Sequence, residues 1–551
     1  MTEFSALSGP ARRRAWLERV DSTMRSQGVE PAGRVALQAL EAGVEDAAVL
    51  NLAALARYGE GRYDDASQLL KRARALAPRD PHILNTLGVC LQALGQQEEA
   101  LDAYKAAIRT EPAMAAAHFN RGTLLQEMND LKAARACFDK AAALDPDYVE
   151  PLASLAWLDA QAGNTQSARE RGERARALRP ESVLARLAIA SADLQDGKLA
   201  EAGAILLALH RDPSLSPVNR SIVLGLTGDL YDAGGRPAEA FESYRSSNAL
   251  LKELNAPIFD AAGRESALAQ VQRLTGWFDE TDPDRWTQSP PLRSKAADPR
   301  AHVFLVGFPR SGTTLMENVL AAHPDIVSLE EADCLERVAT PYLTSADGLE
   351  RLAVIGGGEA HRQRETYWAR VRALGVEPRG KVFIDKMPLA TVQLPVIAKL
   401  FPTARILFAR RDPRDVVLSC FRRRFGLNPS MYELLTLDGA AAFYDAVMRL
   451  AGIYASLLPL PQHVVRYESL VEDLEGRARS ALEFVGLDWD PRLLDFAAKA
   501  KSRGITTPSA AQVARGLNRE GQGVWRRYVS QMSPVLPLLQ PWVERFDYQP
   551  E

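Results

Sequence analysis

The residues with the clearest chemical potential form a segment in which an apolar run breaks into a loop and then opens a helix. The run is Val303 to Val306, the loop is Gly307 to Gly312, and Thr313 begins the helical pattern. Such a loop directs backbone N–H groups and the positive end of a helix dipole at one point. The segment therefore predicts an anion cradle that holds a phosphate with Arg310, Ser311, Gly312, Thr313 and Thr314.

This loop differs from the loop of a nucleotide triphosphatase at one position. The spacing from Gly307 to Gly312 matches a Walker A motif, but Thr313 stands where that motif carries lysine. Without the lysine nothing in the loop reaches a β- or γ-phosphate, whereas guanidinium and hydroxyl groups still hold a terminal monophosphate. The alternative is an ordinary strand–turn–helix with glycine at the turn. One arginine, one serine and two threonines around the turn favour the cradle.

A second cationic segment follows another apolar run, Arg405 to Ala409. A helix beginning near Pro413 would place Ser419 and Arg423 four residues apart on one face, where they could share a phosphate with Arg411. The alternative is a basic helix surface balanced by two nearby aspartates. Two monophosphate sites in one domain indicate a nucleotide with phosphates at separate ribose positions rather than a triphosphate chain.

Composition limits the classes of protein and partner. A chain of 551 residues exceeds one hydrophobic core, so we expect two or three domains. Lys and Arg number 67 against 70 Asp and Glu, and this balance gives no general argument for nucleic acid or membrane surfaces. We therefore expect no nucleic-acid partner. No stretch approaches the ~18 apolar residues of a membrane span, and the N-terminus lacks the apolar core of a signal peptide, so we expect a cytoplasmic protein.

The four cysteines, Cys90, Cys137, Cys334 and Cys420, are far apart in the sequence and form no CxxC pair. Neither a disulfide framework nor a zinc site is indicated, and we expect no metal. We expect these residues to be small buried side chains in a reducing compartment.

A period of 34 residues runs through the N-terminal half. Aligning residues 81–114 with 115–148 superposes Gly88 on Gly122, Ala100 on Ala134, Tyr104 on Phe138 and Pro112 on Pro146. The pattern extends in both directions, to a sixth unit with Gly228, Ala240 and Tyr244. It resembles a tetratricopeptide repeat array. We expect the small residues to let helix A approach helix B, the aromatic ring to fill the space between units, and the proline to end helix B.

The chain divides into four segments on these patterns. We expect N-terminal helices and a degenerate repeat over 1–45, with Pro31 to Gly43 as a helix B, the repeat array over 46–254, a linker over 255–300 and a catalytic domain over 301–551. The array forms an all-α superhelix, whose concave face suits a peptide or protein ligand.

The last segment alternates short β-rich runs with helical stretches, which predicts a P-loop-like α/β domain with a parallel sheet. The runs are Val303–Val306, Val382–Ile384, Arg405–Ala409 and His463–Arg466. In such a sheet the site lies at the carboxyl ends of the strands.

The C-terminal segment resembles the sulfotransferase family over about residues 300 to 548. Its phosphate loop, Arg411 with Ser419, and Tyr467 to Leu470 resemble that family's 5′-phosphosulfate loop, 3′-phosphate site and tyrosine segment. The tyrosylprotein sulfotransferases in particular are matched by Leu315–Met316, Ala322–Asp325, Glu330–Glu331, Asp385–Pro388 and Ser509–Val513. The resemblance implies the co-substrate 3′-phosphoadenosine 5′-phosphosulfate, held by Arg310, Ser311, Gly312, Thr313, Thr314, Arg411, Ser419, Arg423, Tyr467, Gln512, Arg515 and Asn518.

The same resemblance implies the catalytic roles. Glu331 resembles the general base, and Lys386 and Ser509 resemble the groups that stabilise the departing phosphate oxygen. By analogy with phosphoryl transfer, such a reaction demands positioning and charge stabilisation more than new covalent chemistry. For Glu331 the alternative is a surface carboxylate in an acidic run, and Glu330 stays open as the base. We expect His323, at the end of the loop's helix, to be a structural cap.

The predicted function is sulfuryl transfer to a hydroxyl acceptor, which is a peptide, glycan or small molecule that the repeat array recruits. Tyrosylprotein enzymes carry Arg two positions after the base, whereas this chain has Asp333, which would repel acidic peptides. Protein tyrosine is therefore one candidate among several alcohols. Two alternatives stay open. Thr313 argues against a P-loop phosphotransferase, and the presence of Glu331, Lys386 and Ser509 argues against a repeat scaffold whose nucleotide-binding domain is inactive.

Overall fold

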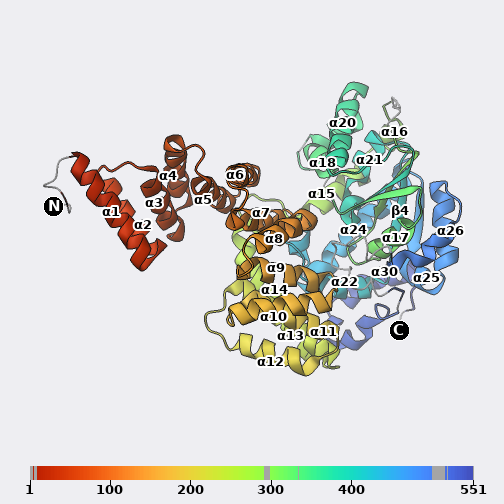
Figure 1. Ribbon diagram of the computed structural model, residues 1–551. Coiled ribbons are helices and arrows are strands. Elements are labelled where there is room, and N and C mark those ends of the chain that lie inside the picture. Colours follow the sequence, from red (N-terminus) through yellow and green to blue (C-terminus); the bar gives the residue numbers. More distant parts are fainter. Residues whose placement is uncertain are drawn as a thin grey trace. The chain divides into compact units, whose positions relative to one another are not determined.

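The computed structural model describes residues 4, 9–290, 298–332, 334–345, 347–498, 516–517 and 519–549 (Figure 1). These residues fall into two compact units, which we describe separately. The first comprises Met1–Leu158 with Ser167–Ala188, and the second comprises Asp159–Gln166 with Ile189–Glu551.

The N-terminal half consists of helices, and within each unit many helices that are consecutive in sequence pack against each other. They are α1 (Gly9–Gln27), α2 (Val29–Glu41), α3 (Ala47–Gly59), α4 (Tyr63–Leu76), α5 (Pro81–Ala93), α6 (Gln97–Thr110), α7 (Ala115–Glu127), α8 (Leu131–Leu144), α9 (Val149–Gln161), α10 (Thr165–Leu178), α11 (Val183–Gln195), α12 (Leu199–His210), α13 (Pro217–Ala233) and α14 (Pro237–Phe259). Four of these helices, α4, α6, α8 and α10, end just before the periodic prolines, as the repeat pattern predicts.

Glycine and an aromatic ring form the contact between the two helices of a repeat. A Cβ atom on Gly88 of α5 would lie 2.5 Å from the Tyr104 ring of α6, and one on Gly122 of α7 would lie 2.6 Å from the Phe138 ring of α8. The rings therefore lie against the glycine of their own repeat. Only a residue without a side chain permits this approach.

The second unit contains a five-stranded sheet with entirely parallel pairing, in the order β2-β3-β1-β4-β5. Its strands are β1 (Ala301–Val306), β2 (Ile326–Glu330), β3 (Val382–Lys386), β4 (Arg405–Arg410) and β5 (Gln462–Arg466). The parallel sheet confirms the predicted fold class. Sequence analysis does not predict β2, because Ser328 and Glu330 interrupt its apolar character. These polar residues fit the strand because they face Glu317 and Lys386.

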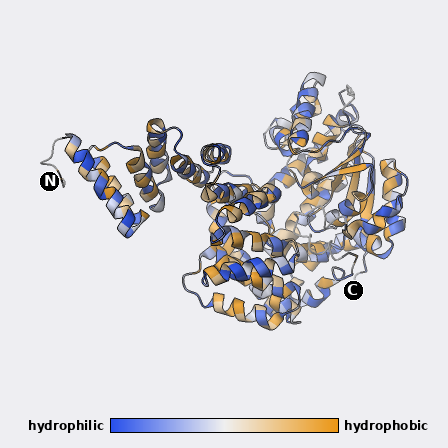
Figure 2. Cartoon of the chain, in the orientation of Figure 1, coloured by the Kyte–Doolittle hydropathy of each residue, from blue (hydrophilic) through white to orange (hydrophobic). Residues whose placement is uncertain are grey.

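Helices cover both faces of the sheet, and the alternating side chains of each strand divide into two cores. Phe304, Phe383 and Ile406 belong to one core, whereas Leu305 and Leu407 belong to the other. Figure 2 shows the strands as largely hydrophobic, as expected for a sheet buried on both sides. The elements around the sheet are α17 (Thr313–Leu320), α18 (Glu336–Leu343), α19 (Gly348–Ala353), α20 (Gly357–Ala373), η1 (Pro388–Gln393), α21 (Leu394–Leu400), α22 (Pro413–Arg422), α23 (Pro429–Glu433), α24 (Leu437–Leu457), α25 (Tyr467–Glu472), α26 (Leu474–Val485), η2 (Pro491–Asp495), η3 (Val524–Tyr528), α29 (Val529–Met532) and α30 (Leu536–Arg545).

The segment before the sheet carries two further helices, α15 (Ala267–Glu280) and α16 (Asp284–Thr287). Val271, Leu274 and Phe278 of α15 are buried in the same core as the strand residue Phe304. The ring of Phe278 lies 4.9 Å from that of Tyr454 in α24. Part of the segment expected as a linker is thus packed against the sheet domain.

The last repeat, α13 with α14, is also joined to this domain. Asp232 of α13 accepts hydrogen bonds from Arg422 at the end of α22 and from the Tyr528 hydroxyl, the latter at 2.6 Å. Asn248 of α14 donates to the Phe421 carbonyl at 2.8 Å. The same compact unit therefore contains the sixth repeat and the sheet.

Replacing Gly228 of α13 with alanine should destabilise the second unit. A Cβ there would lie 2.4 Å from the Tyr244 ring, whose hydroxyl is held by Asp229 at 2.9 Å. We expect a loss of about 1–3 kcal/mol, measured by urea unfolding. Gly203 of α12 is the control, because its nearest neighbour would be 3.5 Å away. Gly203→Ala should be neutral or stabilising by up to about 1 kcal/mol, and equal effects of both changes would contradict the packing argument.

Candidate active site

Each of the five strands ends next to one predicted site element. The loop 307–312 follows β1, Glu331 follows β2, Lys386 ends β3, Arg411 follows β4, and Tyr467 follows β5. Because all strands are parallel, these ends lie along one edge of the sheet. The fold thus places residues that are up to 160 positions apart in sequence along one edge.

The phosphate loop has a constrained backbone. Gly312 has φ 99° at the start of α17, and a Cβ there would lie 2.8 Å from Cδ2 of Tyr467. Arg310 also has a positive φ, 69°, which is uncommon for a residue with a side chain and concentrates at functional sites. The loop conformation therefore requires glycine at 312 and holds Arg310 in a strained arrangement.

Hydroxyl groups of the loop and its helix fit a bound anion. The Ser311 Oγ is buried and has no hydrogen-bond partner among the described residues. Thr313 and Thr314 are buried in the first turn of α17. An unsatisfied buried hydroxyl costs free energy unless a ligand completes it, so the loop suits an anion's oxygen atoms. By this criterion its residues fit the phosphosulfate end of the expected co-substrate.

The guanidinium groups converge next to this loop. Arg310 Nε donates to Ser419 Oγ at 3.0 Å, and Arg411 Nη1 donates to the Arg310 carbonyl at 2.9 Å. Burial lowers the pKa of Arg310 to about 9, and repulsion from Arg423 and Arg411 contributes to the shift. Cations that repel one another in a buried site would be stabilised by an anion.

Arg423 lies just beyond the helix on which it was expected. Helix α22 begins at Pro413 as predicted but ends at Arg422, and Arg423 is already extended with ψ 134°. The neighbouring Arg424 pairs with Asp229 of α13 at 3.4 Å. Arg423 therefore does not share a helical face with Ser419, although its charge still acts on Arg310.

Helix α22 also anchors the segment around Gly521. Arg411 Nη2 donates to the Gly521 carbonyl, and the Arg411 guanidinium lies 4.8 Å from the centre of the Tyr467 ring. Asp415, one turn further, accepts from the Gly523 and Trp525 amides at 2.7 and 2.9 Å. This anchoring fixes the chain next to the predicted anion site.

Lys386 and Glu331 form an ion pair at the same sheet edge. Lys386 Nζ donates to Glu331 Oε1 at 2.7 Å, and carboxylate oxygens of Glu317 and Glu330 lie 3.5 and 3.7 Å away. Burial lowers the pKa of Lys386, but the three carboxylates outweigh burial and raise it above its ordinary value. The Lys386 side chain is fully buried, whereas Glu331 retains 29% exposure and has φ 42°. Glu331 is therefore the most exposed of the three carboxylates around Lys386.

Several predicted residues lie outside the described part of the chain. These are Ser509, Gln512, Arg515 and Asn518, together with Asp333.

The remaining expectations concern His323 and the cysteines. His323 Nδ1 accepts from the Asp325 amide at 3.0 Å in the turn after α17, which agrees with a structural cap. All four cysteines are free and buried, as predicted.

Two residues of the site region escaped sequence analysis. Glu317 stands in the mostly apolar stretch Leu315–Leu320, and the sequence marks Asp415 only as a charge that balances nearby arginines. A lone acidic residue one turn after a phosphate loop was the available signal for Glu317.

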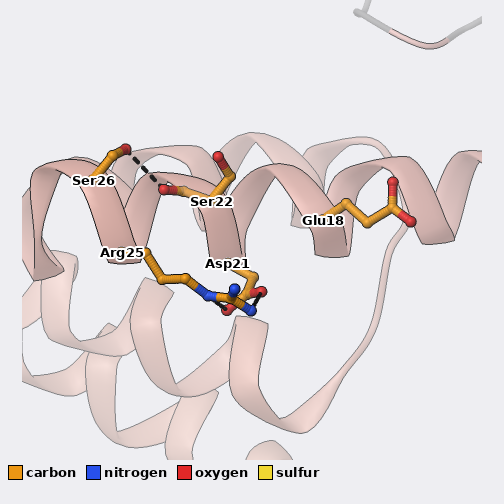
Figure 3. Close-up of a pocket in the computed structure, with 5 residues that line it drawn as sticks. All are labelled: Glu18, Asp21, Ser22, Arg25 and Ser26. Carbon is orange, nitrogen blue, oxygen red and sulfur yellow. Dashed lines mark hydrogen bonds and ion pairs between the residues drawn. The ribbon is translucent and has the colours of Figure 1, made fainter.

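Other features of the described residues lie apart from the sheet edge. No group of three or more His, Cys, Asp or Glu side chains among them is placed to hold a metal ion. None of their helices combines the length and apolar character that crossing a bilayer requires. A surface hollow on α1 is lined by Glu18, Asp21, Ser22, Arg25 and Ser26 (Figure 3). Its Arg25 is paired with Asp21 on the same helix, so the hollow offers no obvious chemistry.

Comparison with known proteins connects these features to families. Residues 302–491 match the model of the sulfotransferase family, and residues 51–112 and 115–148 match tetratricopeptide repeat models. The second repeat match coincides with a unit of the 34-residue period.

Individual relatives align with slightly less than half of the chain. Protein-tyrosine sulfotransferase 1 of Danio rerio is 28% identical over 263 residues, which is 45% of this chain and 72% of that protein. Protein-tyrosine sulfotransferase A of Caenorhabditis elegans is 27% identical over 265 residues, 45% of this chain and 67% of that protein. An uncharacterized protein of Aquifex aeolicus is 25% identical over 266 residues, but these span 46% of this chain and only 34% of that relative.

The strand-end loop and the ion pair of Lys386 with Glu331 both lie within the residues that match the sulfotransferase family model. Residues 302–491 therefore form a sulfotransferase-family domain, and tetratricopeptide repeats precede it in the same chain.

Proposed function

We propose that the chain transfers a sulfuryl group from 3′-phosphoadenosine 5′-phosphosulfate to a hydroxyl acceptor. Residues 301–551 are the proposed catalytic domain. Glu331 acts as the base, and Lys386 with Ser509 stabilises the departing phosphate oxygen. The donor is held by the loop Arg310 to Thr314. The other donor-binding residues are Arg411, Ser419 and Arg423 after β4, Tyr467 after β5, and Gln512, Arg515 and Asn518 after η2.

One arrangement carries this proposal: a base and a cation are paired at the sheet edge that also holds the anion cradle. Glu331 and Lys386 are 2.7 Å apart, and the charge of Glu331 acts on Arg310 of the cradle. Acceptor activation and leaving-group stabilisation would therefore occur next to the bound donor. Thr313, in place of the Walker lysine, disfavours the alternative of a P-loop phosphotransferase.

The reaction breaks the S–O bond to the 5′-phosphate and forms an S–O bond to the acceptor oxygen. The acceptor proton passes to Glu331, and the products are a sulfate ester and adenosine 3′,5′-bisphosphate. Lys386 offsets the charge that develops on the phosphate oxygen, where a fixed ammonium in a buried site acts more strongly than in water.

The names of two relatives and the residue at position 333 bear on the acceptor class. The relatives from Danio rerio and Caenorhabditis elegans are named protein-tyrosine sulfotransferases, which makes tyrosine one candidate. Asp333 disfavours the acidic peptides that an arginine there would attract. The repeat array would recruit the acceptor or a partner protein. A cytoplasmic location stays a prediction.

Arg411→Ala should weaken the binding of adenosine 3′,5′-bisphosphate. Losing a buried guanidinium that bonds a phosphate costs about 1.5–3 kcal/mol, which is about a 10- to 150-fold increase in Kd by isothermal titration calorimetry. Arg479→Ala is the control, because that exposed arginine lies on α26, where it pairs with Glu475 and covers the Trp489 ring. Equal effects of the two variants, or binding of ATP without the bisphosphate, would contradict the two-phosphate site.

Glu331→Gln should strongly lower the kcat of transfer while leaving donor binding intact. The substitution keeps the shape but removes the proton acceptor, so we expect kcat to fall by about 10²–10⁴-fold. The measurement uses sulfur-labelled donor and a cell lysate as the source of acceptors, followed by turnover on the labelled acceptor.

Glu330→Gln serves as the matched comparison for this assay. The Glu330 carboxylate lies 3.7 Å from Lys386 and is less exposed than that of Glu331, so kcat should fall less in Glu330→Gln than in Glu331→Gln. A larger loss in Glu330→Gln would assign the base to Glu330 instead. Bisphosphate binding with no labelled acceptor in any lysate would support an inactive scaffold.

A further inference from the structure

Glu317 is a buried acid that the proposed reaction does not yet use. It lies one turn into α17, directly after the phosphate loop, and is 1% exposed. Ser328 of β2 donates to its Oε1 at 2.8 Å, and its Oε2 lies 3.5 Å from the Lys386 ammonium. A helix that begins at the anion cradle thus also reaches the cation at the neighbouring strand end.

The charged groups around Lys386 come from separate elements. Glu317 comes from α17, Glu330 from the end of β2, and Glu331 from the residue after it. These three are the charges that raise the pKa of Lys386 against the opposing effect of burial. The fully buried ammonium therefore depends on carboxylates rather than on water.

Proton transfer in the proposed reaction would remove the strongest of these partners. When Glu331 takes the acceptor proton, the carboxylate at 2.7 Å becomes neutral. Lys386 is needed as a cation at that moment, because negative charge then develops on the leaving oxygen. Of the three carboxylates, only those that do not take the proton can then help to hold the ammonium in its charged form.

Glu317 meets this need better than Glu330. It is closer to Lys386, at 3.5 Å against 3.7 Å, and its side chain is 1% exposed against 17%. Solvent screens a charge less when both partners are buried. The bond from Ser328 also orients the Glu317 carboxylate.

We propose that Glu317 is a positioning residue that keeps the Lys386 ammonium charged and in place while Glu331 is protonated. This role rests on the proposed function, since it matters only if Glu331 accepts a proton. Glu317 acts through Lys386 and needs no contact with donor or acceptor.

The first test titrates Lys386 without turnover, using the ¹³Cε signal of labelled lysine assigned with Lys386→Arg. Glu331→Gln mimics the protonated base. In this variant Lys386 should remain an ammonium to at least about pH 10. In Glu317→Gln/Glu331→Gln the titration midpoint of Lys386 should fall by a further ~1–3 pH units. Glu330→Gln/Glu331→Gln should show a smaller fall. An unchanged midpoint in the Glu317 double variant would overturn the proposal.

The second test is the pH profile of Glu317→Gln. An ammonium with a lowered pKa is lost as pH rises, so the alkaline limb of kcat should move to lower pH by about 1 unit or more. At pH 8, kcat should fall about 10- to 100-fold, with both KM values changed less than about 3-fold. Glu317→Asp, which retains the charge, should recover part of the rate. A uniform loss with an unmoved alkaline limb would mean a purely structural role and overturn the proposal.

The two tests distinguish failure of the proposed function from failure of the Glu317 role. If the wild type turns over no acceptor, the proposed function fails, but the titration still decides whether Glu317 holds the Lys386 charge. If Glu317→Gln does not fold, Ser328→Ala replaces it, because this change releases the Glu317 carboxylate without removing its charge. We then expect a smaller fall in the Lys386 midpoint, and no fall would overturn the proposal.

Discussion

The burial of the Lys386 ammonium is the constraint around which the sheet edge is organised. Taking such an ion out of water costs several kcal/mol unless opposite charges surround it. Those charges come from two neighbouring elements, because β2 pairs in register with β3 and places Glu330 opposite Lys386, while α17 brings Glu317. The Glu331 amide also donates to the Lys386 carbonyl at 2.8 Å, which extends the β2 pairing by one residue. The strand order and the position of α17 thus both bring carboxylates to the buried Lys386 ammonium.

A second network ties the last repeat to the same chemistry. Asp232 of α13 pairs with Arg422 at the end of α22, and it also accepts from Tyr528 just after the anchored segment at Gly521. Helix α22 carries Ser419, which holds Arg310 of the phosphate loop. A movement of α13 would therefore disturb the partly buried Arg422–Asp232 ion pair on the helix that carries Ser419. The sixth repeat is structurally part of the sheet domain's compact unit, whereas residues 1–158 form the other unit with 167–188.

The features that sequence analysis predicted are those that local spacing determines. The pairs Gly88–Tyr104 and Gly122–Phe138 recur at a fixed distance because each is a contact inside one repeat. The phosphate loop is likewise contiguous. Strand β2 and the role of Glu317 depend on partners far along the chain, so Ser328 and Glu330 looked like loop residues until Glu317 and Lys386 were placed beside them. Helix α15 has a helical apolar spacing at Val271, Leu274 and Phe278, but it lies outside the 34-residue period that marks the repeats. The predicted contacts of Ser509 to Asn518 lie outside the described residues.

The small net charge of −3 conceals two opposed local fields. On one side, Arg310 and its neighbours Arg411 and Arg423 repel one another and favour an anion. On the other, three carboxylates surround Lys386. In the free protein the ammonium is already satisfied by Glu331. In the proposed reaction, a leaving phosphate oxygen would compete with that carboxylate and would gain the advantage only as Glu331 becomes neutral. Proton removal from the acceptor and charge stabilisation on the donor would in this way be two halves of one exchange of partners.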